Sequence, residues 1–156
     1  MLLVKLSIAQ TYISIAPALT NVAGTIAFKS NESIEIGRQW EVFSLGLDYG
    51  RSTLTKIVGR DTANYVEIRP NLNIFQVGKY TNTFTAGIGY VFKAHQNLMT
   101  ELTYGIEYTY TEQIHFNVQF GTYYYSGIKY ASNESFFGVS IMYFFKPYKN
   151  GAIINK

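Results

Sequence analysis

Apolar and polar residues alternate almost without a break from position 64 to about position 145. Between Val66 and Ile74 every second residue is apolar, and charged or amide side chains stand between them. The same pattern runs from Phe84 to Phe92, where threonine and glycine fill most of the alternate positions. Successive side chains of a strand point to opposite faces of a sheet, so this periodicity predicts β-strands with one apolar face.

The same periodicity, together with the turn residues that interrupt it, predicts eight strands. Two irregularities are expected in the first part of the chain. Pro17 lies within the first strand and cannot donate a ladder hydrogen bond, which requires an edge-like or bulged position. Apolar residues change parity between Ile36 and Leu45, which predicts a β-bulge near positions 39–42. The predicted strands are 11–19, 22–29, 34–50, 64–78, 81–93, 98–110, 112–126 and 133–146.

The composition of the polar face indicates that this face lies inside a barrel. Charged residues make up 15% of the chain, whereas a typical soluble domain has about 25%. The polar strand positions are mostly threonine, glycine, asparagine, serine and glutamine, which are small neutral groups that fit inside a narrow barrel. A soluble sheet would expose lysine and glutamate there instead. The opposite face, rich in tyrosine and phenylalanine, is therefore predicted to contact lipid.

Connection lengths favour an even number of strands, about eight in all. When both termini lie on one side, connections alternate between outer loops and inner turns, and the inner turns of transmembrane barrels are short. The longest connection, 51–63, falls on an outer position, as do 94–97 and 127–132. The tight links at 79–80 and 111 fall on inner positions. The position of each connection, outer or inner, therefore agrees with its length.

Alternating tyrosine and phenylalanine opposite neutral polar positions resembles the small eight-stranded outer-membrane β-barrels of bacteria. The resemblance implies an all-β fold, an antiparallel up-and-down transmembrane β-barrel, in the outer membrane of a Gram-negative bacterium and in contact with its lipids. One feature departs from this pattern. Such barrels usually end on an aromatic residue that the assembly machinery reads, whereas here Phe145 is followed by a polar tail. The tail implies either an internal signal or membership of a larger assembly.

The first nine residues resemble the end of a signal peptide. Ser7 and Ala9 are small residues at the −3 and −1 positions of a cleavage site before Gln10. Cleavage before glutamine is common in Bacteroidetes-type bacteria, whose signal peptides this segment resembles. The alternative is a first strand that begins at Leu2. The chain is therefore divided into a signal-peptide remnant at 1–9, a β-barrel at 10–146 and a C-terminal tail at 147–156.

Ionisable side chains of interior parity form the candidate site. A buried charge must be paired and hydrogen-bonded. These residues therefore predict a polar network that fills the narrow lumen and fixes the strand register, with Arg69 within salt-bridge distance of at least one of the acids. A proton- or ion-conducting path is the alternative. The predicted network consists of Asp48, Glu67, Arg69, Glu101, Glu107 and His115.

Residues for several other chemistries are missing. The chain has no cysteine, which excludes disulfides and thiolate metal sites. His95 and His115, its two histidines, provide no metal-ligand spacing, so neither a metal nor another cofactor is expected. The basic residues are scattered, and a net charge of +3 without a basic run does not indicate nucleic-acid binding. Three cations in the longest loop, Arg51, Lys56 and Arg60, suit the phosphates of lipopolysaccharide; a solvated loop is the alternative.

These features predict a non-enzymatic barrel with a plugged polar lumen and a structural or accessory role, beside a larger outer-membrane protein. An eight-stranded barrel leaves no water-filled pore, which argues against a channel. The first alternative is a soluble calycin-like barrel that holds an apolar ligand against an inward Tyr/Phe face. The second is a lipid-modifying outer-membrane enzyme, which requires a serine or threonine beside His115 in space.

Overall fold

A computed structural model describes residues 9–22, 28–53, 62–92, 98–126, 133–148 and 151–155. The predicted signal-peptide remnant lies almost entirely outside these residues and stays a prediction. In the described part of the chain no helix is long and apolar enough to span a membrane. The described strands are β1 (Gln10–Val22), β2 (Phe28–Trp40), β3 (Phe43–Thr53), β4 (Thr62–Val77), β5 (Tyr80–Val91), β6 (Leu98–Thr109), β7 (Ile114–Ser126), β8 (Glu134–Phe144) and β9 (Ile154–Asn155).

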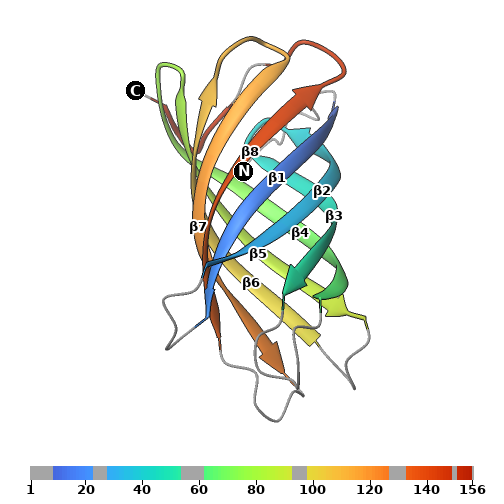
Figure 1. Cartoon of the computed structure of the whole chain (residues 1–156). Coiled ribbons are helices and arrows are strands. Elements are labelled where there is room, and N and C mark those ends of the chain that lie inside the picture. Colours follow the sequence, from blue (N-terminus) through green and yellow to red (C-terminus); the bar gives the residue numbers. More distant parts are fainter. Residues whose placement is uncertain are drawn as a thin grey trace, which may run out of the picture.

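The eight long strands close into an antiparallel up-and-down barrel (Figure 1). Each strand pairs with its neighbours in the sequence, and β1 pairs with β8 to close the sheet. β1, β3, β5 and β7 finish at the same end of the barrel, which we call the loop end. The turns at 41–42, 78–79 and 110–113 form the opposite end, the turn end. The predicted all-β, eight-stranded barrel is confirmed.

The boundary between the second and third strands differs from the prediction. One long strand was expected at 34–50 with a bulge near 39–42, but the chain reverses there in a two-residue turn between Trp40 and Phe43. Glu41 takes a positive φ of 30°, and the rings of Trp40 and Phe43 stack at a centroid distance of 5.9 Å. The reversal, rather than a bulge, causes the change of parity. The turn replaces the predicted break at 30–33, so the number of long strands remains eight.

Pro17 occupies neither an edge nor a bulge. Between β1 and β8, Ile15 pairs with Ile141 and Ala18 pairs with Gly138. These pairs lie three residues apart on both strands, so the register continues unchanged across Pro17 and only the ladder is interrupted. The expectation of a bulge at this proline is therefore wrong. A register shift occurs instead near the end of β4, between Asn73 and Phe75.

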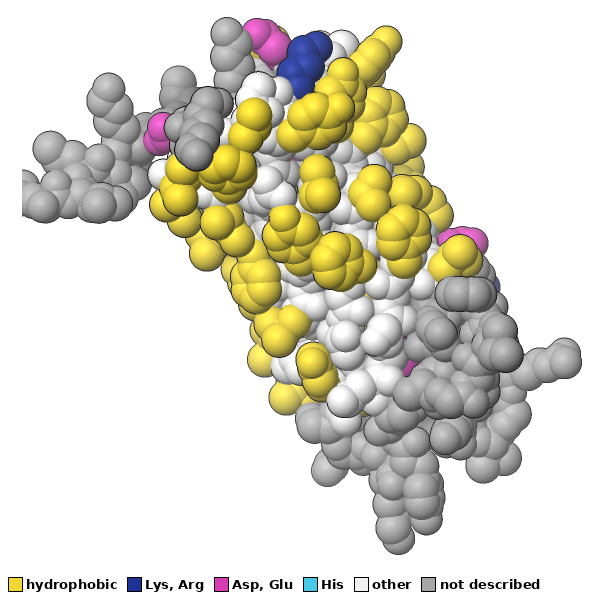
Figure 2. Space-filling model, turned by 90° about the vertical axis from the view of Figure 1, so that its left-hand side faces the viewer, with side chains coloured by type: hydrophobic (Ala, Val, Ile, Leu, Met, Phe, Trp, Pro, Cys, Tyr) yellow, Lys and Arg dark blue, Asp and Glu magenta, His cyan; other side chains and the backbone are white. Residues whose placement is uncertain are grey.

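Side chains of outward parity give the barrel an apolar outer wall. Figure 2 shows hydrophobic side chains spread over this wall. Five apolar residues predicted to face outward, Ile74, Phe84, Ile88, Leu102 and Phe120, are between 37% and 55% exposed. The calycin-like alternative required the Tyr/Phe face to line a closed interior. The structure contradicts that alternative because this face is the surface of the barrel.

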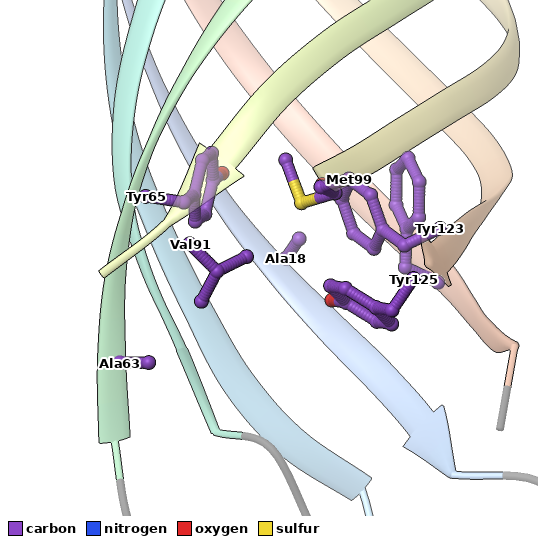
Figure 3. Close-up of a cluster of buried hydrophobic side chains, with 8 residues drawn as sticks. Ala18, Ala63, Tyr65, Val91, Met99, Tyr123 and Tyr125 are labelled. Atoms are coloured by element: carbon purple, nitrogen blue, oxygen red, sulfur yellow. The ribbon is translucent and has the colours of Figure 1, made fainter. Parts of the chain in front are cut away.

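Buried apolar side chains gather in two clusters, one near each end of the interior. The turn-end cluster contains Tyr12, Phe144 and Tyr148, with Met142 packed against it. Figure 3 shows the other cluster, whose side chains come from several strands and point into the barrel. This loop-end cluster contains Ala18, Ala63, Tyr65, Val91, Met99, Tyr123, Tyr125 and Phe136. Polar side chains occupy the layer between the two clusters.

The C-terminal tail begins by entering the turn end of the barrel. The backbone N–H of Tyr148 donates to the carbonyl of Glu112, at 2.7 Å, and its hydroxyl donates to the carbonyl of Glu41, also at 2.7 Å. The Tyr148 ring stacks on Phe144 with a centroid distance of 4.8 Å. Burial raises the pKa of the Tyr148 hydroxyl, so this group remains a hydrogen-bond donor at neutral pH. Tyr148 thus joins the turns at 110–113 and 41–42.

The remainder of the tail reaches the opposite wall. Gly151 N–H donates to the Glu41 carbonyl at 3.3 Å, and the Asn73 side-chain amide donates to the Gly151 carbonyl at 2.9 Å. Ile153 N–H then donates to the Asn73 carbonyl at 3.0 Å. The tail ends as β9, which pairs in parallel with β4 where β4 extends past β3. The described tail residues therefore lie across the turn end, from β8 to β4 (Figure 1).

Candidate functional site

The candidate site is the polar layer between the two apolar clusters. Period-two alternation brings its side chains inside, since Glu67 and Arg69 occupy successive inward positions of β4 and Glu101 and Glu107 share the inward face of β6. The structure places all six residues of the predicted network in the interior, between 0% and 8% exposed: Asp48, Glu67, Arg69, Glu101, Glu107 and His115. They form two groups rather than one continuous network.

Arg69 is the centre of the first group. Its Nη1 donates to Glu35 Oε2 at 2.7 Å, and its Nη2 donates to Glu101 Oε1 at 2.8 Å. The guanidinium therefore joins β4 to β2 and to β6 across the interior. Thr103 also donates to Glu101 Oε1, at 2.5 Å. Such charge-assisted bonds are stronger than neutral ones, and they fix side chains in a low-dielectric interior.

Glu35 is a member of this group that the sequence analysis missed. It lies on β2, pairs with Arg69, and accepts a hydrogen bond from the Tyr12 hydroxyl. The signal was present in the sequence, because Ile34 and Ile36 both point outward and Glu35 between them must point inward. The inward orientation of Glu35 was missed because a bulge was expected nearby, and a bulge leaves the parity of adjoining residues undefined.

Asp48 and Glu67 lie opposite each other on β3 and β4, and each is 1% exposed. Neither oxygen of the Glu67 carboxyl group has a hydrogen-bond partner among the described residues, and Asp48 Oδ1 also lacks one. Gly87 provides the space for Glu67, since a Cβ atom at Gly87 would lie 2.0 Å from Glu67 Oε1. The first group therefore contains more carboxyl groups than Arg69 can neutralise.

His115 and Glu107 form the second group, close to the turn end. His115 Nδ1 lies 2.5 Å from Glu107 Oε1, and the imidazole ring packs on Phe144 at a centroid distance of 4.7 Å. Thr109 is the cross-strand partner of His115. The hydroxyl of Thr109 and Nε2 of His115 both lack a hydrogen-bond partner among the described residues. A threonine thus lies near His115, but it does not form the hydrogen bond that would activate a nucleophile, and His115 is 0% exposed.

A small polar cavity separates the two groups. Its volume is about 30 Å³, which accommodates roughly two water molecules. Its lining comes from both groups and from the turn-end cluster: Tyr12, Ser14, Glu35, Gln39, Ser44, Arg69, Asn71, Thr85, Glu107, Asn117, Gln119, Ser140 and Met142. Among the described residues, no set of three or more His, Cys, Asp or Glu side chains is placed to hold a metal ion.

The fold is shared with solved structures of small β-barrels. Neisserial surface protein A superposes with a TM-score of 0.64 at 9% sequence identity, over 88% of this chain and 97% of that protein. The N-terminal β-barrel domain of Pseudomonas aeruginosa OprF superposes with a TM-score of 0.59 at 16% identity, over 86% and 99% of the two chains. A de novo designed transmembrane β-barrel gives 0.55 at 12% identity, over 85% and 94%.

No protein-family model matches the sequence, and no curated protein is similar to it. At the identities above, the structural likeness establishes the fold alone. That fold is the eight-stranded barrel of small bacterial outer-membrane proteins.

Proposed function

We propose that this chain is an outer-membrane β-barrel of a Gram-negative bacterium, with a lumen closed to solutes and a structural or accessory role without enzymatic activity. One observation carries the proposal. An apolar outer wall surrounds an interior filled by ion pairs and aromatic rings, whose described polar cavity measures only about 30 Å³. A wall of this kind is stable in lipid, and such an interior provides no path for solutes.

Aromatic residues at both ends of the outer wall support a membrane location. Tyr80, Tyr110 and Tyr143 are exposed at the turn end, and Tyr49 and Tyr90 are exposed toward the loop end. Tyrosine is enriched at membrane–water interfaces, where its ring meets the acyl region and its hydroxyl meets water. Tyrosines at both ends of an apolar wall are typical of a spanning barrel. Outer-membrane lipids would then surround the wall, with lipopolysaccharide phosphates near exposed Arg51 at the loop end.

Membrane location makes a direct prediction about extraction. The protein expressed with an export signal should sediment with membranes, remain there after a wash at high salt and high pH, and dissolve only in detergent. The reason is that the exposed side chains of the outer wall are mostly apolar. Immunoblots of the wash and detergent fractions measure this, with a soluble periplasmic protein as the control. Recovery of folded protein in the aqueous wash would contradict the proposal.

The closed lumen makes a second prediction, about conductance. Purified barrel inserted in a planar lipid bilayer should produce no steady, reproducible current steps, because ion pairs and aromatic clusters fill the described interior. A porin inserted in the same bilayer provides the positive control. Steady steps that scale with the number of inserted barrels would contradict a closed lumen and favour a channel. Insertion itself is checked by protease protection, so that an empty bilayer is not counted as a closed barrel.

The accessory role places a larger membrane protein against the outer wall. A shallow, open apolar groove of about 400 Å³ lies on this wall between Phe84, Leu102, Tyr104 and Phe120. The hydroxyl groups of Thr122 and Ser135 lie 3.5 Å apart at its side. Small residues flanked by aromatic rings let another membrane-embedded element approach the sheet closely. We propose this groove as the contact surface of the accessory role.

A further inference from the structure

The Glu67 carboxyl group lies in the interior, where no described residue donates a hydrogen bond to it. Glu67 extends over β5, where a Cβ atom built on Gly87 would lie 2.0 Å from Glu67 Oε1 and 3.2 Å from Glu101 Cβ. The carboxyl group therefore sits between the β4 backbone and the Glu101 side chain on β6. Both its oxygens are buried and lack a partner among the described residues, and Glu101 Oε2 lacks one as well. The carboxyl groups of Glu67 and Glu101 thus lie side by side, and no described residue donates a hydrogen bond between them.

The charged groups around Glu67 do not neutralise the negative charge that an ionised Glu67 would carry. Arg69 is the guanidinium of this layer, and its two terminal nitrogens already bond to Glu35 and Glu101. The charged groups that act on Glu67 are Glu101 on β6, Arg69 on β4 and Asp48 on β3. Glu35 on β2 is the other ion-pair partner of Arg69. One guanidinium therefore serves four carboxyl groups.

We infer that Glu67 holds a proton in the folded barrel and donates it in a hydrogen bond to Glu101. An ionised Glu67 would be a buried charge without a partner, next to a second carboxylate, and both conditions strongly oppose ionisation. A single proton taken up from solvent removes the uncompensated charge. It also gives Glu101 Oε2 and one of the two Glu67 oxygens a hydrogen bond. Arg69 then remains paired with two carboxylates, Glu35 and Glu101.

A proton fits this site better than a metal cation does. No set of three or more acidic or histidine side chains in the described residues is placed to hold a metal ion. The proton links folding to pH, because the folded barrel then holds a proton that an unfolded glutamate releases at neutral pH. Stability should therefore fall as the pH rises above neutrality. The polar layer is in this way a proton-binding site as well as a structural network.

Infrared spectroscopy of the folded protein in detergent micelles tests the inference. A protonated carboxyl group has a C=O stretching band that is separate from the amide bands and shifts in heavy water. We expect this band in the wild-type protein at neutral pH and its complete loss in E67Q. The control variant is E32Q, which removes an exposed carboxylate of β2 and should leave the band unchanged. Absence of the band from the wild-type protein would overturn the inference without any variant.

Stability supplies a second, independent measurement. An amide has nearly the shape of a protonated carboxyl group and donates to Glu101, so E67Q should fold with an unfolding midpoint equal to or above that of the wild type. E101Q should lower the midpoint, because Arg69 loses a charged partner. A band that persists in E67Q, or an E67Q chain that fails to fold, would overturn the inference. The inference would also be overturned if the wild-type protein lacked the protonated carboxyl band and its unfolding midpoint rose specifically with sodium or calcium. That result would assign a bound cation to the site.

Discussion

Replacing Arg69 with methionine should lower the free energy of unfolding by roughly 3–5 kcal/mol, the usual cost of removing one partner from a buried ion pair. Methionine fills much of the volume of arginine and leaves no large cavity, so the loss is mainly electrostatic. Glu35 and Glu101 would both remain in the interior without the guanidinium that now bonds to each of them. The strands β2, β4 and β6 would also lose the group that joins them.

Urea titration of the refolded protein in detergent micelles measures this loss, with the fluorescence of Trp40, the single tryptophan, as the probe. Arg38 provides a matched control, because it lies on the exposed face of β2. Its replacement by methionine should change the free energy by less than about 0.5 kcal/mol. Equal and small losses in the two variants would mean that water already solvates the Arg69 layer.

The pH dependence of the Arg69→Met variant identifies the cause of its instability. Acid protonates carboxylates in general, so lowering the pH removes uncompensated negative charge from the interior. The difference in stability between variant and wild type should therefore shrink as the pH falls. A difference that stays constant with pH would indicate lost packing rather than lost charge compensation.

The fold was predictable from the sequence because a single physical pattern controls it. A strand has a side-chain period of two. Once one face of the sheet is assigned to the interior, parity places Ile88 on the outer wall and Glu101 and Arg69 in the lumen. The prevalence of small neutral residues on the polar face made that assignment, and the exposed Phe84 and Ile88 agree with it. The two groups in the polar layer were less predictable. Which acid reaches Arg69 depends on the stagger between strands, which alternation does not specify.

Two features, the turn at 41–42 and the path of the tail, had no adequate signal in the sequence. The turn at 41–42 lacks glycine, proline or asparagine, and Glu41 adopts its positive φ without them. This turn was therefore mistaken for a bulge, and Glu35 was missed as a consequence. The path of the tail was also unpredictable, because its contacts are made by backbone carbonyls of Glu41, Asn73 and Glu112. Backbone groups are present at every residue and carry no sequence signature.

The tail gives the second large effect: Tyr148→Ala should lower the free energy of unfolding by about 3 kcal/mol, as for other buried aromatic residues replaced by alanine. The ring that stacks on Phe144 and lies against His115 would be lost, together with the hydrogen bond to Glu41. Tyr148→Phe keeps the ring and should cost only about 1 kcal/mol.

Tyr143→Ala is the matched control for Tyr148→Ala, since Tyr143 is 42% exposed on the outer wall beside the same cluster. Urea titrations of the three variants separate the ring, the hydroxyl group and the general cost of removing a tyrosine. Tyr148→Ala should be the least stable of the three because it alone removes a ring from the turn-end cluster, where the described tail joins β8 to β4. If Tyr143→Ala and Tyr148→Ala lose the same stability, the tail is an appendage and not part of the core. A loss of stability in Tyr148→Ala without a comparable loss in Tyr143→Ala would mean that the tail is part of the folded core of the barrel.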